Sequence, residues 1–571
     1  MSQIDGVALL VKIASSSKQR PLGEDMTAAE ELVKDFGCLA LAIVHAGAFI
    51  AHSPGMNIVK YRSLFLSQRQ RMLEEYSQLP QLAKLDERSD TVYTTWKLCY
   101  DQLKPESREL LWLLAYLHYD GISEDIFRRA AQNMRSKAYP LPFASLESQA
   151  QEHVRQYLSS FLDSDGNWDT VKFAGVMGDL ASYSLVDFDR MGLTFRLHVL
   201  VHDWAKTVVP HTPGLAIECK ATVLSLSIDQ EEDAESQAFK RQLGLHVTSV
   251  LTHNPDVGAN HCKYFTEVYS CIGQWTKKAE LEEKFLAVFQ RELGSNAVET
   301  WWAMHELALS CTEIGQLDKA LLLHTQVVDA HKRILGEEHP LTLTSMDNLG
   351  VTYTHLGRYN EAEQLQLQVL DAYKRILGEE HLHTLTSMNN LASTYSRLGR
   401  HNEVEHIQIL LLDSHRRILG EEHPYTLVSM NNLALAYSDM GRLNEAEQLQ
   451  IQVFNTRQRI LGKEHLHTLA SMSNLALTYS RLGRHSEAEQ FQVQVVNSCK
   501  RILGEEHPNT LLSMNNLAWS YSYLCQWDEA TELFHKAISI AERKLGNQHP
   551  DTQLYHRSLE LMETWRTDSE S

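Results

Sequence analysis

The sequence lacks the features that define several common functional classes. It contains no G-x-x-x-x-G-K-[ST] motif, whose backbone N–H groups and lysine neutralise phosphate charge in nucleotide-binding loops. Its eight cysteines are scattered and none form a C-x-x-C pair, which is typical of a reducing compartment and not of a disulfide or zinc framework. No nucleophile–base pair or carboxylate dyad stands out. We therefore predict a protein that is not an enzyme, with no catalytic residue, no cofactor and no metal site.

Long apolar runs and excess positive charge are also missing. The best apolar run, residues 38–51, is about 14 residues long and contains His45, so it is too short to span a bilayer and indicates a buried helix. No secretory signal is visible. The net charge of −20 repels nucleic acids and anionic membrane surfaces, but it does not exclude a local basic groove. We expect a cytoplasmic protein that binds neither nucleic acid nor membrane.

What the sequence does contain is a repeat. At 571 residues the chain is too long for a single core, so several domains are expected. A fixed period of 20–50 residues indicates a solenoid, in which each unit buries its apolar face against its neighbours. Glycines recur every 42 residues, at positions 294, 336, 378, 420, 462, 504 and 546.

Each unit is predicted to be a helix–turn–helix. In the copy at residues 340–378, apolar residues predict a first helix that ends at Gly357, and Asn360 with Glu363 resembles a capping box that starts a second helix. Proline suits the first turn of the first helix in the copies that begin at Pro340, Pro424 and Pro508. The apolar positions of the first helix are Met346, Leu349, Tyr353 and Leu356.

Small residues are expected to face each other inside each unit, where they let the two helix axes approach closely. On the first helix these are Gly350, Ala392, Ala434, Ala476 and Ala518. On the second helix they are Ala362, Ala446, Ala488 and Ala530, with Val404 as the exception.

The unit resembles the tetratricopeptide repeat (TPR) through Leu349-Gly350, Tyr353, Gly357, Tyr359 and Ala362. The usual period of that repeat is about 34 residues, and the 42-residue version with its L-G-E-E-H-P link is similar to the kinesin-light-chain type. The resemblance covers roughly residues 261–560 and implies a right-handed α-solenoid. We interpret the degenerate copy near Gly273 as an N-terminal cap and residues 550–565 as a closing helix.

Residues 1–260 lack the repeat but contain two recognisable stretches. Residues 37–43 and the following Ala/Gly-rich helix resemble the G-L-P-L-A segment of the NB-ARC module of signal-transducing NTPases with numerous domains (STAND). Cys38 and Ala40 stand where that family has glycine and proline. Residues 91–130, closing with a short hairpin through Phe195, resemble the winged-helix subdomain of the same module.

The stretch at residues 197–205 is similar to the M-H-D segment of fungal NB-ARC–tetratricopeptide proteins. The resemblance implies that His198 contacts the terminal phosphate of a nucleotide, but Val199 replaces the acidic residue. Without a phosphate-binding loop we interpret His198 as a packed structural histidine. We expect the chain to begin inside the helical part of the module, either because the nucleotide-binding core was lost or because the gene model is truncated.

The expected fold class is all-α, with a tetratricopeptide solenoid preceded by a helical and winged-helix domain that carries a short β-hairpin. The expected domains are an NB-ARC-like helical segment (1–90), a winged-helix-like subdomain (91–210), a helical connector (211–260), the solenoid (261–560) and a polar tail (561–571).

Asparagines recur on the first helix at positions 348, 390, 432, 474 and 516. In tetratricopeptide arrays this position lines the concave groove, and an amide can grip an extended backbone because it both donates and accepts. The alternative is that these asparagines bond between neighbouring helices. The predicted peptide-binding residues are Asn348, Asn389, Asn390, Asn431, Asn432, Asn474, Asn515, Asn516, Arg397 and Arg481.

The arginines suggest that the peptide is partly acidic, since Arg358, Arg400, Arg442 and Arg484 also follow the turn glycines. The Glu-Glu-His triplets of the links repeat with the unit, so we interpret them as structural and not as metal ligands.

The favoured function is a protein–protein interaction scaffold or sensor derived from an NB-ARC–tetratricopeptide regulator. One alternative is a kinesin-light-chain-like cargo adaptor, against which the absence of sustained heptads in residues 1–260 counts. Another is the back half of an ATP/ADP-binding STAND NTPase. Self-association is left open.

Overall fold

The computed structural model describes residues 2–14, 23–36, 38, 40–52, 56–75, 100–183, 185–190, 192–206, 212–229, 231, 233–254, 257–547 and 549–570. The predictions made on residues 37, 39 and 91–99 lie outside these ranges. The chain divides into two compact units, Met1–Val268 and Tyr269–Ser571, which are described separately.

In the residues that the structure describes, the first unit is helical apart from one hairpin. Its helices are α1 (Gln3–Ala14), α2 (Gly23–Asp35), α3 (Ala40–His52), α4 (Ile58–Glu75), α6 (Pro105–Leu114), α7 (Glu124–Asn133), α8 (Ser145–Ser159), α9 (Thr170–Ser182), α10 (Val199–Ala205), α11 (Pro213–Ser227), α12 (Ala234–Gln242), α13 (Gly244–His253) and most of α14 (Ala259–Cys271).

Helix α11 is the centre of this unit and packs against α6, α7, α8 and α13. It is surrounded by other helices, so residues 218–227 are all buried, including the polar ones. The buried ammonium of Lys220 donates to the carbonyl of Tyr116, and burial lowers the pKa of Lys220 to about 6.

The predicted hairpin is confirmed. Strands β1 (Val186–Asp189) and β2 (Thr194–Leu197) pair antiparallel, with Val186 opposite Leu197. The hairpin is tied to the helical body because Leu197 N–H donates to Tyr119 O at 2.7 Å and Phe195 N–H donates to Ile122 O at 2.7 Å. The chain then enters α10 directly after His198.

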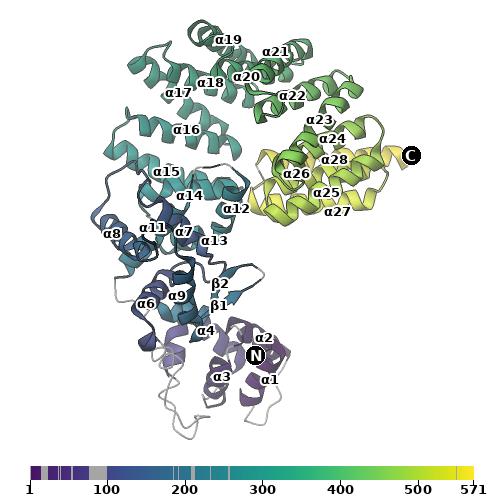
Figure 1. Cartoon of the computed structure of the whole chain (residues 1–571). Coiled ribbons are helices and arrows are strands. Elements are labelled where there is room, and N and C mark those ends of the chain that lie inside the picture. The colour runs from purple at the N-terminus through teal and green to yellow at the C-terminus, as the bar shows by residue number, and fades with distance from the viewer. Residues whose placement is uncertain are drawn as a thin grey trace. The chain divides into compact units, whose positions relative to one another are not determined.

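The second unit is a row of antiparallel helix pairs that curves on itself (Figure 1). We call the first helix of each pair helix A and the second helix B. The A helices are α14, whose last residues belong to this unit, α16 (Val298–Glu313), α18 (Pro340–His355), α20 (Leu382–Arg397), α22 (Pro424–Asp439), α24 (Leu466–Arg481), α26 (Pro508–Tyr523) and the unpaired α28 (Pro550–Glu570). The B helices are α15 (Trp275–Glu292), α17 (Leu317–Leu335), α19 (Tyr359–Leu377), α21 (His401–Leu419), α23 (Leu443–Leu461), α25 (His485–Leu503) and α27 (Trp527–Lys544).

The 42-residue link ends one helix and starts the next. Its glycine ends helix B with a positive φ, +93° at Gly420, which an L side chain rarely adopts. Its histidine is the N-cap of the next helix A: His423 Nδ1 accepts from Tyr425 N–H at 3.3 Å. Pro424 occupies the first helical turn, as predicted.

The predicted capping box at the start of helix B is wrong. Helix α19 begins at Tyr359, so Asn360 already lies inside it, and the N-cap is Arg358 without a side-chain cap. The tight turn after Gly357 causes this shift, because Arg358 N–H donates back to Tyr353 O at 2.9 Å and the helix starts immediately. The carboxylate of Glu363 accepts from Arg400 of the next unit instead.

The small residues inside each pair are buried as predicted. Ala434 and Ala446 have no exposed surface, and a methyl group on Gly350 would lie 2.9 Å from the Gln366 side chain. Val404 packs with Leu391, Ala392 and Tyr395 in the same position.

Candidate peptide-binding groove

The inner side of the curve is formed by the A helices. In Figure 1, α18, α20 and α22 lie on this side, and α19 and α21 lie on the outer side. Each helix A leaves one face partly open to solvent, at positions spaced by four, three and four residues, which is one side of a helix. We call this face the inner stripe; in α22 it consists of Val428, Asn432, Leu435 and Asp439.

The predicted asparagines at 348, 390, 432, 474 and 516 lie half-buried on the inner stripe and, with the residues that precede them in the sequence, form a ladder from unit to unit. Asn432 Nδ2 donates to Asn389 Oδ1 at 3.0 Å, and Asn474 Nδ2 donates to Asn431 Oδ1 at 2.9 Å. Asn516 makes a longer bond of 3.4 Å to Ser473 Oγ. These asparagines therefore do form hydrogen bonds between neighbouring A helices, which was the alternative to ligand binding. Asn348 is half-buried in the same row, and Asn515 is buried below it.

One rung of the ladder carries a charge. Asp347 occupies the position that Asn389 and Asn431 hold in later units, and Asn390 Nδ2 donates to its Oδ2 at 2.7 Å. Burial raises the pKa of Asp347 to about 6, although the bonds from Asn390 and Ser387 oppose that shift.

The first helix pairs of the repeat carry titratable side chains at positions where the later pairs have uncharged ones. His305 Nδ1 lies 3.2 Å from His324 Nε2, and burial lowers the pKa of His324 to about 3. Burial raises the pKa of Glu282 to about 7. The next four units have glutamine where these units have Glu282 and His324, as at Gln408, whose Nε2 donates to Asn389 Oδ1 at 3.2 Å.

The two predicted groove arginines differ in their surroundings. Arg481 donates to Ser438 Oγ at 2.8 Å and to Asp439 at 3.1 Å, both on the preceding helix A. Arg397 is exposed, and the residue 42 positions before it is His355 instead of an acid. Burial lowers the pKa of His355, Glu313 opposes this, and the charge of Arg397 adds to it. Arg397 therefore offers a cation to the groove.

The arginines after the turn glycines form ion pairs and ring contacts within the repeat. Arg400 Nη1 donates to Glu363 at 2.7 Å, Arg400 Nε donates to Glu403 at 2.8 Å, and the guanidinium lies 4.1 Å from the ring centre of Tyr395. Arg442 and Arg484 make the same set of contacts. Arg400, Arg442 and Arg484 thus link one unit to the preceding one, whereas Arg358 pairs with Glu361 of its own helix B.

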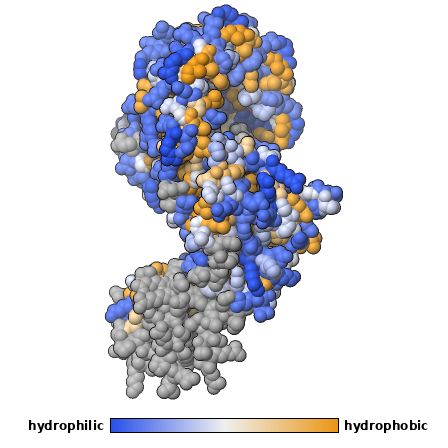
Figure 2. Space-filling model, turned by 90° about the vertical axis from the view of Figure 1, so that its left-hand side faces the viewer, coloured by the Kyte–Doolittle hydropathy of each residue, from blue (hydrophilic) through white to orange (hydrophobic). Residues whose placement is uncertain are grey.

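Apolar residues of the inner stripe were missed by the sequence reasoning. Leu435 and Leu477 are 40% and 41% exposed at the same position of consecutive A helices, and Val428 and Leu512 are 41% and 42% exposed at the position two turns earlier. Their signal in the sequence was an aliphatic residue three positions after Asn432 and Asn474, and four positions before Asn432 and Asn516. Figure 2 shows apolar residues breaking up the otherwise hydrophilic surface of the repeat region.

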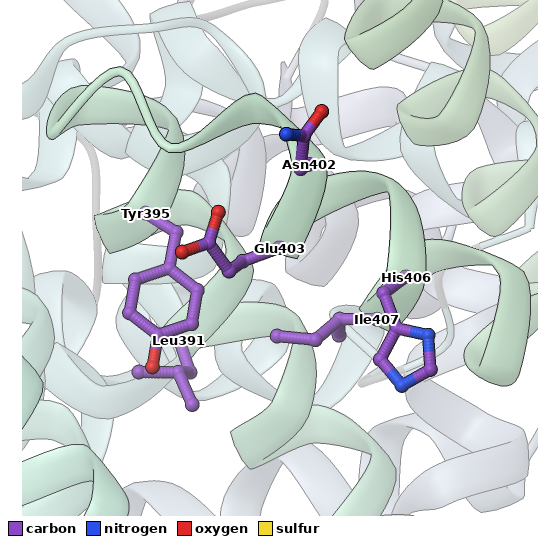
Figure 3. A pocket seen from close by; sticks show the side chains of 6 residues that line it. All are labelled: Leu391, Tyr395, Asn402, Glu403, His406 and Ile407. Carbon is purple, nitrogen blue, oxygen red and sulfur yellow. The ribbon is translucent and has the colours of Figure 1, made fainter.

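A separate pocket of about 400 Å³ lies between α20 and α21. Figure 3 shows Ile407 from helix B pointing toward Leu391 and Tyr395 from helix A, with His406 further from them. Asn402 and Glu403 complete its lining. The pocket belongs to the unit in which Val404 stands where the B helices α17, α19, α23, α25 and α27 have alanine.

His198 and the Glu-Glu-His links, two features singled out in the sequence, make contacts that stabilise helices and connect units. His198 is the N-cap of α10, where its Nδ1 accepts from Leu200 N–H at 3.3 Å. In the Glu-Glu-His links, the histidine caps helix A and the second glutamate pairs with an arginine 37 residues later, as Glu338 does with Arg375 at 2.6 Å. None of the helices that the structure describes has the length and hydrophobicity needed to cross a bilayer.

These paired helices at a constant spacing define the class of the repeat half, an α-solenoid. Residues 304–375, 348–408 and 429–501 match one model of the tetratricopeptide repeat, and residues 510–551 match a second. The chain belongs to the tetratricopeptide-repeat proteins.

The chain is similar to a solved structure from Podospora anserina, a putative kinesin light chain with nearly identical TPR-like repeats. The two are 33% identical over 36% of this chain and 98% of that one, with a TM-score of 0.32. A STAND protein from Pyrococcus horikoshii with a tetratricopeptide repeat sensor is 13% identical over 88% of this chain and 72% of its own length, with a TM-score of 0.34. No significant match was found among curated proteins.

Proposed function

We propose that the repeat half is a non-enzymatic interaction surface that binds an extended protein segment along the inner stripe and acts in the cytoplasm. The observation that carries this proposal is the recurrence of exposed apolar side chains at one position of consecutive A helices, as at Leu435 and Leu477. Apolar groups that recur beside an amide ladder suit a segment that passes from unit to unit, because each unit then meets a new side chain of the ligand.

A partly acidic segment is the favoured ligand. Arg397 is exposed on the inner stripe, whereas the equivalent Arg481 is engaged by Asp439. A carboxylate of the ligand would take the role at Arg397 that Asp439 has at Arg481, as a charge-assisted hydrogen bond.

Peptides selected from a random 12-residue library against the full chain test the proposal. Leu435→Ser with Leu477→Ser should weaken their binding at least tenfold, because the apolar contact with the ligand is lost. Leu367→Ser with Ile409→Ser is the matched control, since these residues are also 42 positions apart and 38% exposed, but lie on helices B. Equal binding by the two double variants contradicts the proposal. Arg397→Glu should then reduce binding only for peptides that contain acidic residues.

We further propose that the first unit derives from the helical and winged-helix part of an NB-ARC module. Cys38 has a φ of +61°, a conformation that favours glycine, and it stands where the resembled family has glycine. The hairpin followed by the His198-capped α10 supports the same proposal. Mapping the 5′ end of the native transcript tests it: an upstream in-frame G-x-x-x-x-G-K-[ST] would favour an ATP/ADP-driven switch over a nucleotide-free scaffold.

A further inference from the structure

The turns between helices A and B are alike in backbone but not in surroundings. Their glycines at 273, 315, 357, 399, 441 and 483 all have φ between +67° and +77°. A methyl group on Gly273 would lie 2.7 Å from Pro508 Cδ, and one on Gly315 would lie 2.8 Å from Pro550 Cδ. At the other four glycines, no described atom of another element would lie within 4 Å of the methyl group.

A hydrogen bond accompanies this approach. His549 Nε2 donates to the carbonyl of Glu313 at 2.8 Å, while its Nδ1 accepts from Asp551 N–H at 3.2 Å. The side chain is 7% exposed. The histidine that caps α28 is therefore also bonded to the end of α16.

The two contacts follow the repeat. Gly273 with Pro508, and Gly315 with Pro550, are each 235 residues apart, so in both cases a turn meets the start of the helix A six units later. Six units thus complete one turn of the superhelix, and the next units touch the first ones. We call this contact the clasp. It closes the wall that the A helices form around the inner stripe.

We propose that, because of the clasp, the groove accepts an extended segment with a free end and excludes a segment held between two folded domains. This inference rests on the proposed function. A segment with a free end enters along the axis of the closed turn. A segment with a folded domain at each end cannot pass through the wall unless the first helix pair (α14 and α15) separates from the seventh (α26 and α27).

The clasp is tested first by hydrogen exchange on the full chain. Gly315→Ala and Gly441→Ala impose the same backbone strain, because both glycines have φ of +77°, but only the first inserts a methyl group against Pro550. Exchange in residues 311–316 and 549–556 should rise at least tenfold more in Gly315→Ala than in Gly441→Ala. Equal exchange in these segments overturns the clasp.

Entry is tested with a peptide selected from the random 12-residue library. The peptide is measured free, fused to one small globular protein, and fused between two copies of it. The doubly fused form should associate at least tenfold more slowly with the wild type than the singly fused form does. The rate should recover in Gly315→Ala and not in Gly441→Ala.

Equal association of the singly and doubly fused forms with the wild type overturns the inference while leaving the proposed function intact. A library that yields no peptide dependent on Leu435 and Leu477 overturns the proposed function, and the inference with it.

Discussion

At the scale of the residue, Asp347 is a departure from the repeat whose effect depends on pH. Its pKa in the folded protein is about 6, above the value near 3.9 of an exposed carboxyl. The folded state therefore binds the proton more tightly, and stability falls as pH rises from about 4 to about 6. Asp347→Asn should raise the free energy of unfolding at pH 7.5 by roughly 1–3 kcal/mol and change it little at pH 4.5. Urea titrations at both pH values measure this.

The reciprocal variant Asn431→Asp is the control, because it places a carboxyl on another rung of the same ladder. It should destabilise the protein at pH 7.5 more than at pH 4.5. A pH-independent effect of both variants would contradict the role given to burial of the charge.

The asparagine ladder also changes what a groove substitution should do. Asn432→Ala removes the donor to Asn389 Oδ1, so it should lower stability by about 1 kcal/mol in addition to any effect on a ligand. A melting temperature identical to that of the wild type would show that the bond between units contributes nothing. Ligand binding should therefore be compared at a temperature at which both proteins are fully folded.

Cys525 breaks the glycine pattern of the turns and keeps its backbone. Its φ is +59°. The six equivalent turn positions, 273, 315, 357, 399, 441 and 483, are all glycine, with φ between +67° and +77°. Cys525→Gly should raise the free energy of unfolding by about 0.5–1 kcal/mol, because an L side chain is strained in this conformation. Thermal melting measures the change. Cys525→Ala separates the causes: it removes the thiol but keeps the strain, so it should leave stability unchanged.

At the scale of the element, each helix A depends on the histidine of the link before it. His423→Ala should lower the free energy of unfolding by about 1 kcal/mol, because Tyr425 N–H loses its acceptor. His423→Asn should retain most of the stability, since asparagine is a good N-cap. If both variants are equally destabilised in urea titrations, the histidine acts through something other than the cap.

Element boundaries show where sequence reasoning succeeds and where it stops. Proline at the start of α18, α22 and α26 and glycine at the end of the B helices set these boundaries locally, and both were predictable. The start of helix B was not, because the Asn360–Glu363 pattern suits a cap but Glu363 is bonded to Arg400, 37 residues away. A local pattern cannot reveal a competing partner in the next unit.

At the scale of the whole molecule, the destabilisation caused by a core substitution in one repeat should stay within the repeat half. Ala434 is fully buried against its neighbours, so Ala434→Asp places a charge where no room or partner exists. We expect amide exchange to rise most in residues 424–461 and progressively less in more distant repeats, because each unit is stabilised mainly by its neighbours. Residues 2–254 should keep their exchange rates, since they belong to a separate compact unit. Uniform loss of protection along the whole chain would contradict this.

The 42-residue period, the helix pairs, the small residues between them and the short hairpin are encoded locally, in spacings of three, four and 42 residues, so the sequence by itself determined them. The tertiary structure alone decided which side chains of the inner stripe bond to each other, which arginines are held by the next unit, and where Gly273 and Gly315 meet Pro508 and Pro550. The physical reason is that these contacts depend on the small rotation from one unit to the next, which accumulates over six units and leaves no mark in any single copy.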